Sequence, residues 1–314
     1  MRLDDVHPDL RDMARRAPRV DVGNAAMRVL ARFGARHLVP AARAPGVTTR
    51  DLRAGSLRLR VHSPGTHTGG ALLWIHGGGM VIGAPRQDAR LCARMAAQLG
   101  ITVVAPQYRL APEHPFPAPQ EDCLAAWTWL QAHAAELGVD PARVAVGGAS
   151  AGGGLAASVV NAVHDAARGR SRGTEPVAQL LIYPMLDDRT ATRTDLDALD
   201  HPVWNNAANR VGWTALLLGT SRPGDDTVPA AAAPARREDL RGLPPTWIGV
   251  GDIDLFHDED VAYARRLKAA GVPVVLDVVP GAPHGFDTLG VDAEVAARFT
   301  ERALAWLRDA VAPR

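Results

Sequence analysis

Between positions 144 and 163 the chain passes from a short apolar run, residues 144–146, through Gly148-Ala149-Ser150-Ala151-Gly152 into a helical pattern. A serine flanked by glycines between a strand and a helix is typical of a sharp turn that lifts the serine hydroxyl above the sheet edge. A phosphate-binding loop is the alternative reading of a glycine-rich turn at the start of a helix. The lysine of such a loop is missing here, so we favour the raised serine.

From residue 71 onward, short apolar runs alternate with helical patterns, which predicts an α/β fold with a mostly parallel sheet. The expected buried strands are residues 71–75, 101–105, 144–146, 178–182, 246–250 and 274–279. The expected helices are residues 87–99, 121–135, 152–163, 258–270 and 292–310. Residues 57–61 alternate apolar and charged side chains, so we predict an antiparallel strand at the sheet edge.

Two regions depart from this alternation. Residues 1–45 have the spacing of amphipathic helices. Residues 186–240 carry scattered aspartates and an Ala/Pro-rich stretch at 229–235, which we interpret as a solvated loop. We predict that 186–240 is a mainly helical insertion that packs with residues 1–45. The core of the protein is then formed by residues 46–185 and 241–314.

The sequence His76-Gly77-Gly78-Gly79 directly follows the first expected buried strand. Glycines allow backbone N–H groups to approach a substrate oxygen with no Cβ in the way. We therefore predict that the amides of Gly77 and Gly78 stabilise an oxyanion together with the amide of Ala151, the residue after the serine. His76 is expected to order this loop, with Gly79 in support.

Candidates for an acid and a base follow two later strands. Asp252, Asp254 and Asp258 come after residues 246–250, and His284 follows the last expected strand. Asp258 could cap the next helix, whereas Asp252 and Asp254 remain close contenders for a carboxylate that orients a histidine. A histidine beyond the last strand can reach both Ser150 and the acid, which predicts nucleophilic catalysis.

Composition argues against several other classes of protein. The formal net charge is +1 with no long basic or acidic block, so we expect no nucleic-acid partner. No metal motif of the H-E-x-x-H or C-x-x-C type is present, and we expect neither a metal nor a cofactor. Cys92 and Cys123 read as buried apolar residues. There is no spanning apolar segment and no signal-peptide pattern, so we expect a cytoplasmic protein.

Together these motifs resemble the hormone-sensitive-lipase-like branch of the α/β-hydrolases, the bacterial carboxylesterases with an H-G-G-G motif. The matching pieces lie in order over about residues 70–290. They are His76–Gly79, Tyr108-Arg109-Leu110-Ala111-Pro112-Glu113-His114-Pro115-Phe116-Pro117, Gly148–Gly153, Tyr183-Pro184-Met185-Leu186-Asp187, Asp254-Leu255-Phe256-His257-Asp258-Glu259 and His284-Gly285-Phe286.

The resemblance implies the α/β-hydrolase fold, with about eight strands and a helical cap built from residues 1–45 and 186–240. It also implies that Asp254 is the acid of a triad with Ser150 and His284. Members of the family hydrolyse short- to medium-chain esters, and some act on lactones or amides. Two departures are Ala149, where aspartate is commonest, and the pair Leu255-Phe256 after the acid.

Several alternatives stay open from the sequence. An amidase, a lactonase or an acyltransferase could use the same triad, and a non-catalytic receptor on this fold is a further alternative. Trp204 and Trp213 could line an acyl pocket or could simply hold the cap together. By analogy, an exposed edge strand could support a homodimer. The expected partner is a small-molecule ester.

Overall fold

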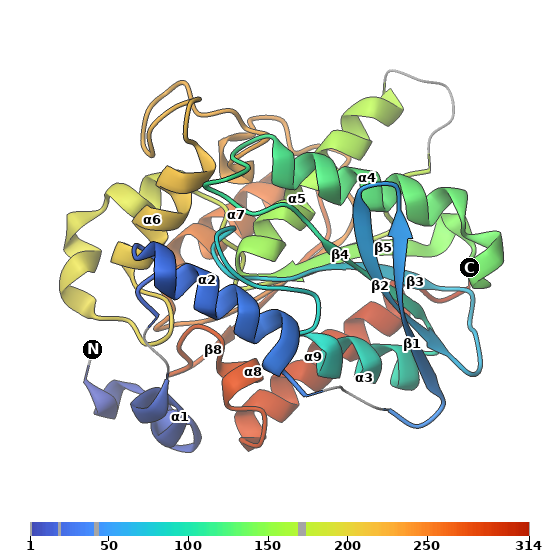
Figure 1. Ribbon diagram of the computed structural model, residues 1–314, viewed down its shortest axis with the longest axis horizontal. Helices are drawn as coiled ribbons and strands as arrows, with labels where there is room; N and C mark the ends of the chain where they lie inside the picture. The colour runs from blue at the N-terminus through green and yellow to red at the C-terminus, as the bar shows by residue number, and fades with distance from the viewer. Residues whose placement is uncertain (1, 18–19, 41–43, 169–173, 314) are drawn as a thin grey trace.

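The computed structural model describes residues 2–17, 20–40, 44–168 and 174–313, which form an eight-stranded sheet between layers of helices (Figure 1). The strand order is β1-β2-β4-β3-β5-β6-β7-β8. Strands β3 to β8 run parallel, while β1 and β2 are antiparallel. Their bounds are β1 (Val47–Ala54), β2 (Leu57–Pro64), β3 (Ala71–Ile75), β4 (Thr102–Gln107), β5 (Val144–Ala149), β6 (Gln179–Ile182), β7 (Thr246–Gly251) and β8 (Val274–Val279).

The prediction that residues 57–61 form the edge of the sheet is wrong. They belong to β2, which pairs with β4 on one side and with β1 on the other, so β1 is the edge strand. Strand β1 escaped prediction because most of its side chains are exposed and it shows no apolar alternation. A two-pronged ion pair with both N–O distances at 2.7 Å joins Arg60 of β2 to Asp51 of β1.

The five expected core helices are confirmed, with α5 extending five residues beyond its predicted end at 163. Their bounds are α3 (Ala89–Leu99), α4 (Ala118–Ala132), α5 (Ala151–Arg168), α7 (His257–Ala269) and α9 (Glu294–Ala310). Helices α4, α5 and α7 lie on one side of the sheet in Figure 1, while α3 and α9 lie on the other.

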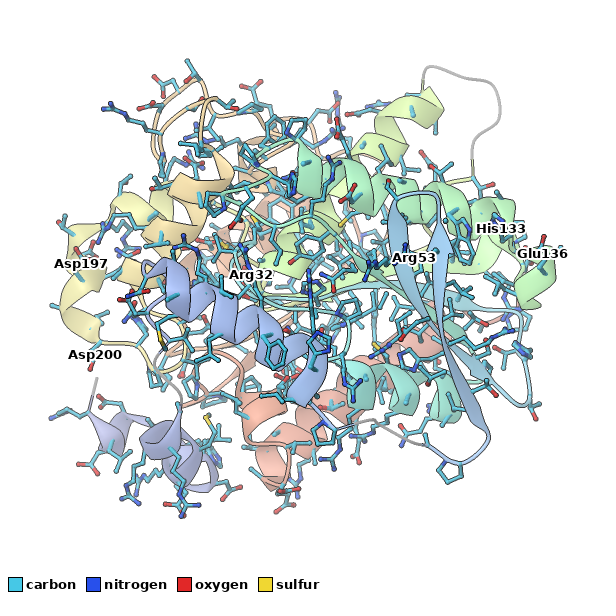
Figure 2. All side chains as sticks on the ribbon, viewed as in Figure 1. Arg32, Arg53, His133, Glu136, Asp197 and Asp200 are labelled. Carbon is cyan, nitrogen blue, oxygen red and sulfur yellow. The ribbon has the colours of Figure 1, made fainter. Side chains whose placement is uncertain are left out.

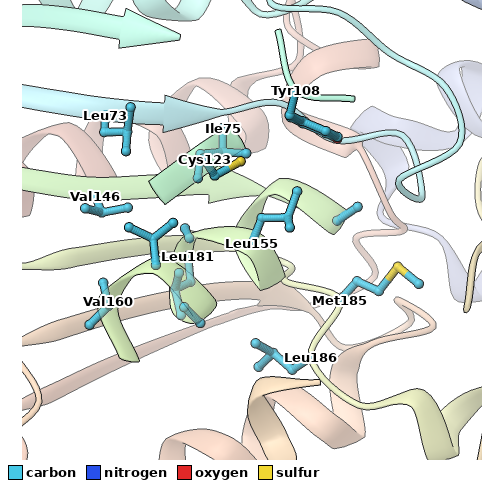
Figure 3. Close-up of a cluster of buried hydrophobic side chains, with 14 of the residues drawn as sticks. Leu73, Ile75, Tyr108, Cys123, Val146, Leu155, Val160, Leu181, Met185 and Leu186 are labelled. Carbon is cyan, nitrogen blue, oxygen red and sulfur yellow. The ribbon is translucent and has the colours of Figure 1, made fainter. Parts of the chain in front are cut away.

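Each face of the sheet buries its own apolar cluster, because side chains alternate along a strand. In β3, Leu73 and Ile75 pack with Leu155 of α5 (Figure 3), whereas Leu72 and Trp74 belong to the opposite cluster. Burying each large apolar side chain contributes about 1.5–3 kcal/mol. This two-sided burial fixes the strand ends from which the functional loops emerge.

Residues 186–240 are less helical than predicted. Within this stretch, all of which the structure describes, α6 (Asn206–Leu216) is the one α-helix. The rest consists of turns and short 3-10 segments, namely η6 (Asp188–Thr192), η7 (Thr194–Leu199) and η8 (Pro234–Arg236). The interpretation of 229–235 as a solvated loop is wrong, because Ala232 and Ala233 are buried in the core.

The N-terminal region divides into two parts. Its second helix, α2 (Ala25–Phe33), and the π-helical turn η3 (Gly34–Leu38) cross the front of the molecule in Figure 1. Before α2, Gly23 packs near Val211 of α6, which joins the two regions. The first residues, including α1 (Arg11–Arg16), lie instead near the loop after β8, where the amide of His7 donates to Gly281 at 2.8 Å.

Candidate active site

Ser150 occupies a strained turn between β5 and α5. Its φ is +56°, a left-handed conformation that costs a non-glycine residue roughly 1–2 kcal/mol. Two backbone hydrogen bonds fasten the turn to the end of β6, because the Ser150 amide donates to Ile182 at 2.9 Å and the Ser150 carbonyl accepts from Met185 at 3.0 Å. These two hydrogen bonds hold Ser150 in place in the turn between β5 and α5.

The flanking glycines are required by close backbone contacts. A Cβ on Gly148 would overlap the carbonyl oxygen of Gly152, and a Cβ on Gly152 would overlap the carbonyl oxygen of Ile75 at the end of β3. Backbone oxygens cannot move aside as the tip of a side chain can. The glycine-serine-glycine pattern is therefore a packing requirement of this turn.

Three side chains from separate loops meet at this turn. His284 Nε2 lies 2.9 Å from Ser150 Oγ, and His284 Nδ1 lies 2.9 Å from Asp254 Oδ2. The second oxygen of Asp254 accepts the backbone N–H of Phe256 at 2.9 Å, which fixes the carboxylate plane. All three side chains are buried. A carboxylate that accepts from Nδ1 leaves Nε2 free to take a proton from the serine.

The competing aspartates point elsewhere. Asp252 Oδ1 accepts the backbone N–H of Gly281 at 2.6 Å, and Asp258 pairs with Arg193 at 2.8 Å. Of the three aspartates that spacing left in competition, Asp254 is the one hydrogen-bonded to His284.

Two aromatic rings that the sequence analysis did not single out as site residues pack against the His284 imidazole. Tyr183 meets it edge-on at a centroid distance of 4.5 Å, and Phe256 does so at 5.3 Å. The Tyr183 hydroxyl donates to Asp287 at 2.5 Å, and burial raises the pKa of the Asp287 carboxyl. These rings restrict rotation of the imidazole. The sequence signals for these two rings were positional: Tyr183 directly follows β6, and Phe256 lies two residues after Asp254.

The glycine loop after β3 lies against the serine. A Cβ on Gly77 would come within 3.2 Å of the Ser150 Cβ. His76 behind it is fully buried, stacks on Tyr108 at 4.2 Å and has Nδ1 2.8 Å from the Gly77 carbonyl oxygen. Burial lowers the pKa of His76 to about 4, so the ring is neutral at pH 7. Ala151 opens α5, where the first N–H groups have no partner within the helix.

The two tryptophans of residues 186–240 occupy different positions. The Trp204 ring lies so close to Gly79 that a Cβ there would overlap it. Trp213 is wholly buried in the cluster shared with α5. The structure thus brings Trp204 to the glycine loop and leaves Trp213 in the apolar interior.

A histidine of the insertion also lies near the triad and was missed. His201 is buried, and its pKa is lowered, chiefly by that burial. The nearby Asp254 raises this pKa, and His284 lowers it. Two residues on, Val203 adopts a φ of +66° and lies near Gly285, the residue after His284. No periodic pattern marks this segment, so the sequence offered no signal for it.

Among the residues that the structure describes, no group of three or more His, Cys, Asp or Glu side chains could hold a metal ion. Within the same ranges, every helix is too short or too polar to cross a bilayer. Cys92 and Cys123 are buried and unpaired, as expected.

Comparisons with known proteins agree with this geometry. Residues 72–288 match a family described as having the alpha/beta hydrolase fold. Esterase LipI of Mycobacterium tuberculosis is 35% identical over 265 residues, which cover 82% of this chain and 79% of that protein. Ethyl acetate hydrolase of Pseudomonas putida is 34% identical, covering 80% and 77% respectively.

The structural likeness extends over the whole chain. A solved structure of a bacterial heroin esterase superimposes with a TM-score of 0.90 at 36% identity and 99% coverage of both chains. The chain therefore belongs to the α/β-hydrolase-fold family, in its hormone-sensitive-lipase-like branch, and is a carboxylic ester hydrolase.

Proposed function

We propose that this carboxylesterase hydrolyses short- to medium-chain esters through an acyl-enzyme intermediate, with Ser150 as nucleophile, His284 as general base and Asp254 as the orienting acid. The two hydrogen bonds of 2.9 Å that link these side chains are the observation that carries the proposal. A serine hydroxyl is a weak nucleophile unless an adjacent base removes its proton, and this arrangement supplies that base.

The reaction runs in two halves. Ser150 Oγ attacks the ester carbonyl while His284 takes its proton, and Asp254 stabilises the imidazolium that forms. The N–H groups of Gly77, Gly78 and Ala151 stabilise the oxyanion, each contributing about 2.7–4 kcal/mol to the transition state. His284 then protonates the leaving alcohol, and water repeats the sequence to release the acid.

Residues 1–45 and 186–240 are proposed to form a cap beside this site. Two contacts support this: Trp204 lies against Gly79, and Arg32 of α2 donates to the carbonyls of Val81 and Ala111 at 2.8 Å each. Trp204 would then form one wall of the acyl pocket, and Trp213 would hold the cap to the core.

We also propose that the protein forms a homodimer and is cytoplasmic. The edge strand β8 exposes Val275 and Val278, which suits pairing between two copies and can be checked by light scattering. The two buried free thiols suit a reducing compartment, which cell fractionation would check.

Replacing the nucleophile tests the proposed roles. Ser150→Ala should lower kcat/KM for p-nitrophenyl acetate and butyrate by at least about 10³-fold while the melting temperature is kept. Ser158→Ala on the same helix is the matched control and should keep activity, because Ser158 lies in α5 away from the elbow. Full activity of the Ser150 variant would refute the mechanism.

An acyl series from two to sixteen carbons tests the substrate class. A fall in kcat/KM beyond about eight carbons is expected of a small pocket. Efficient turnover of insoluble long-chain esters would contradict the proposed preference and leave the triad intact.

A further inference from the structure

A cavity with a volume of about 800 Å³ lies outside the proposed triad. It lies between the β1–β2 hairpin, η3 and the loops that follow β3 and β4, and none of Ser150, Asp254 and His284 lines it. Its size falls within the range of small-molecule sites in proteins. None of the residues assigned above to ester hydrolysis lines it.

The lining of this cavity is strongly basic. It contains seven arginines and only two carboxylates, those of Asp51 and Glu113, so the formal excess is five positive charges. Asp122 and Glu121, which pair with Arg109 from outside the lining, reduce the excess to three. The whole chain carries only +1. Positive charge is thus gathered in one hollow, where low-dielectric walls focus its field on an anion.

Four of the seven guanidinium groups are already fixed in place. Arg32 is paired with Glu113 at 2.8 Å and Arg60 with Asp51 at 2.7 Å. Arg86 Nε donates to the Val39 carbonyl at 2.6 Å, and Arg109 is paired with Asp122 at 2.9 Å. These contacts make the wall rigid before any ligand arrives, which lowers the entropic cost of binding.

The remaining three arginines, Arg36, Arg53 and Arg58, form no ion pair with any carboxylate in the described part of the chain. Arg53 of β1 and Arg58 of β2 are direct partners in the strand register. Like charges directly opposite each other destabilise a sheet, so this pair lowers the stability of the ligand-free protein. An anion between the two guanidinium groups would remove that repulsion.

We propose that this cavity binds an anion carrying two or more phosphate groups. Arg53 and Arg58 of the hairpin and Arg36 of η3 would contact the phosphates. Guanidinium groups bind phosphate through two parallel hydrogen bonds, and a polyphosphate offers enough charge to balance the excess. Figure 2 labels Arg32 on α2 and Arg53 on the hairpin, two of the elements that border the cavity.

The phosphates could come from a free polyphosphate compound or from a lipid headgroup. Phe33 and Leu38 flank Arg36 in sequence and are largely exposed, so they would meet acyl chains if the ligand were a headgroup. The experiment therefore needs one arm for each source.

Calorimetric titration with sodium tripolyphosphate at constant ionic strength forms the first arm. The second is cosedimentation with phosphatidylcholine vesicles, with and without phosphatidylinositol 4,5-bisphosphate. We expect saturable binding in at least one arm, weakened at least tenfold in the double variant Arg53→Gln, Arg58→Gln. The control double variant Arg298→Gln, Arg308→Gln on α9 removes the same charge outside the cavity and should change affinity less than twofold.

The outcomes separate cleanly. Binding of tripolyphosphate alone supports the proposal with a free ligand, and binding of the vesicles supports it with a headgroup. Absence of binding in both arms, or an equal loss in the control variant, overturns it. The melting temperature of the Arg53, Arg58 variant should equal or exceed that of the wild type, because repulsion is removed, so lost binding cannot be mistaken for lost fold.

Discussion

The sheet of the core and the insertion at residues 186–240 are held in place by different combinations of contacts. The core buries alternating apolar side chains on both faces of the sheet. The insertion also buries apolar side chains such as Trp213, but it adds buried carboxyl groups to them: Glu259 of α7 accepts the amides of Leu186 at 2.7 Å and Asp187 at 3.0 Å, and Asp188 pairs with Arg236 at 2.6 Å within the insertion. A segment outside the sheet still has to satisfy its buried backbone groups, and carboxylates do so here.

This contrast assigns the two regions different tasks. Ser150, Asp254 and His284 all stand on loops that leave the core, whereas Trp204 and His201 approach them from the insertion. The core positions the three side chains of the proposed triad, and the insertion approaches the glycine loop. Four predictions test this division of tasks, in order of decreasing expected effect.

The largest effect is expected at the elbow of the core. Gly152→Ala forces a Cβ into the Ile75 carbonyl oxygen, so either α5 or β3 must shift. We expect loss of detectable esterase activity together with a lower melting temperature, measured by hydrolysis of p-nitrophenyl acetate and by circular dichroism. Gly34→Ala, where a Cβ has open space, is the control. An active, stable Gly152 variant would show that the close contact is not required.

The buried charge of the insertion comes next. Asp188→Asn leaves the guanidinium of Arg236 with no balancing charge and should cost roughly 3–5 kcal/mol of unfolding free energy, measured by urea denaturation. Asp12→Asn, which breaks a single exposed pair with Arg15, should leave the midpoint unchanged. Equal midpoints for the two variants would mean that this pair does not stabilise the insertion.

The tryptophans test the boundary between the regions. Trp204→Ala should lower kcat/KM by about 10–100-fold and change the acyl-length preference, because the ring that supports Gly79 is lost. Trp213→Ala should instead cost about 3–5 kcal/mol of stability, since it empties a fully buried site. Trp306→Ala on α9, where the ring is only half-buried, controls for loss of an indole. A stability loss without a change in preference for the Trp204 variant would make that ring purely structural.

The smallest effect concerns acid stability of the core. Burial lowers the pKa of His62 on β2 to about 4, below the value of 6.5 in an unfolded chain. Between these values the unfolded chain binds the proton and the native protein does not, so stability is lost as pH falls from 6.5 toward 4. His62→Gln should reduce the drop in melting temperature between neutral and acidic buffer, measured by calorimetry. His67→Gln, at an exposed position, should leave that drop unchanged.

Periodicity in the sequence predicted the core because parallel strands buried on both faces read as continuous apolar runs. Strands β3 and β8 were predicted with their observed bounds. The elbow at Ser150 was predictable because its glycines are fixed by backbone contact. Spacing alone did not separate Asp252 from Asp254; resemblance to the family pointed to Asp254, and the loop geometry now distinguishes them.

The features that the sequence did not predict depend on contacts between distant parts of the chain. Strand β1 carries exposed side chains, so only its pairing with β2 reveals it. The burial of Ala232 and Ala233 depends on how the insertion folds back onto the core, which no local pattern records. The arginines of the basic cavity come from four parts of the chain, so a sequence without basic blocks still contains a concentrated positive site.

The position of β6 has a consequence for how such proteins can diverge. In the sheet, β6 lies between β5, which leads to Ser150, and β7, which leads to Asp254, and the insertion starts where β6 ends. A lengthened, shortened or rewritten insertion leaves both neighbouring strands in register. Changes in this one segment can therefore alter substrate preference while the positions of Ser150 and Asp254 stay the same.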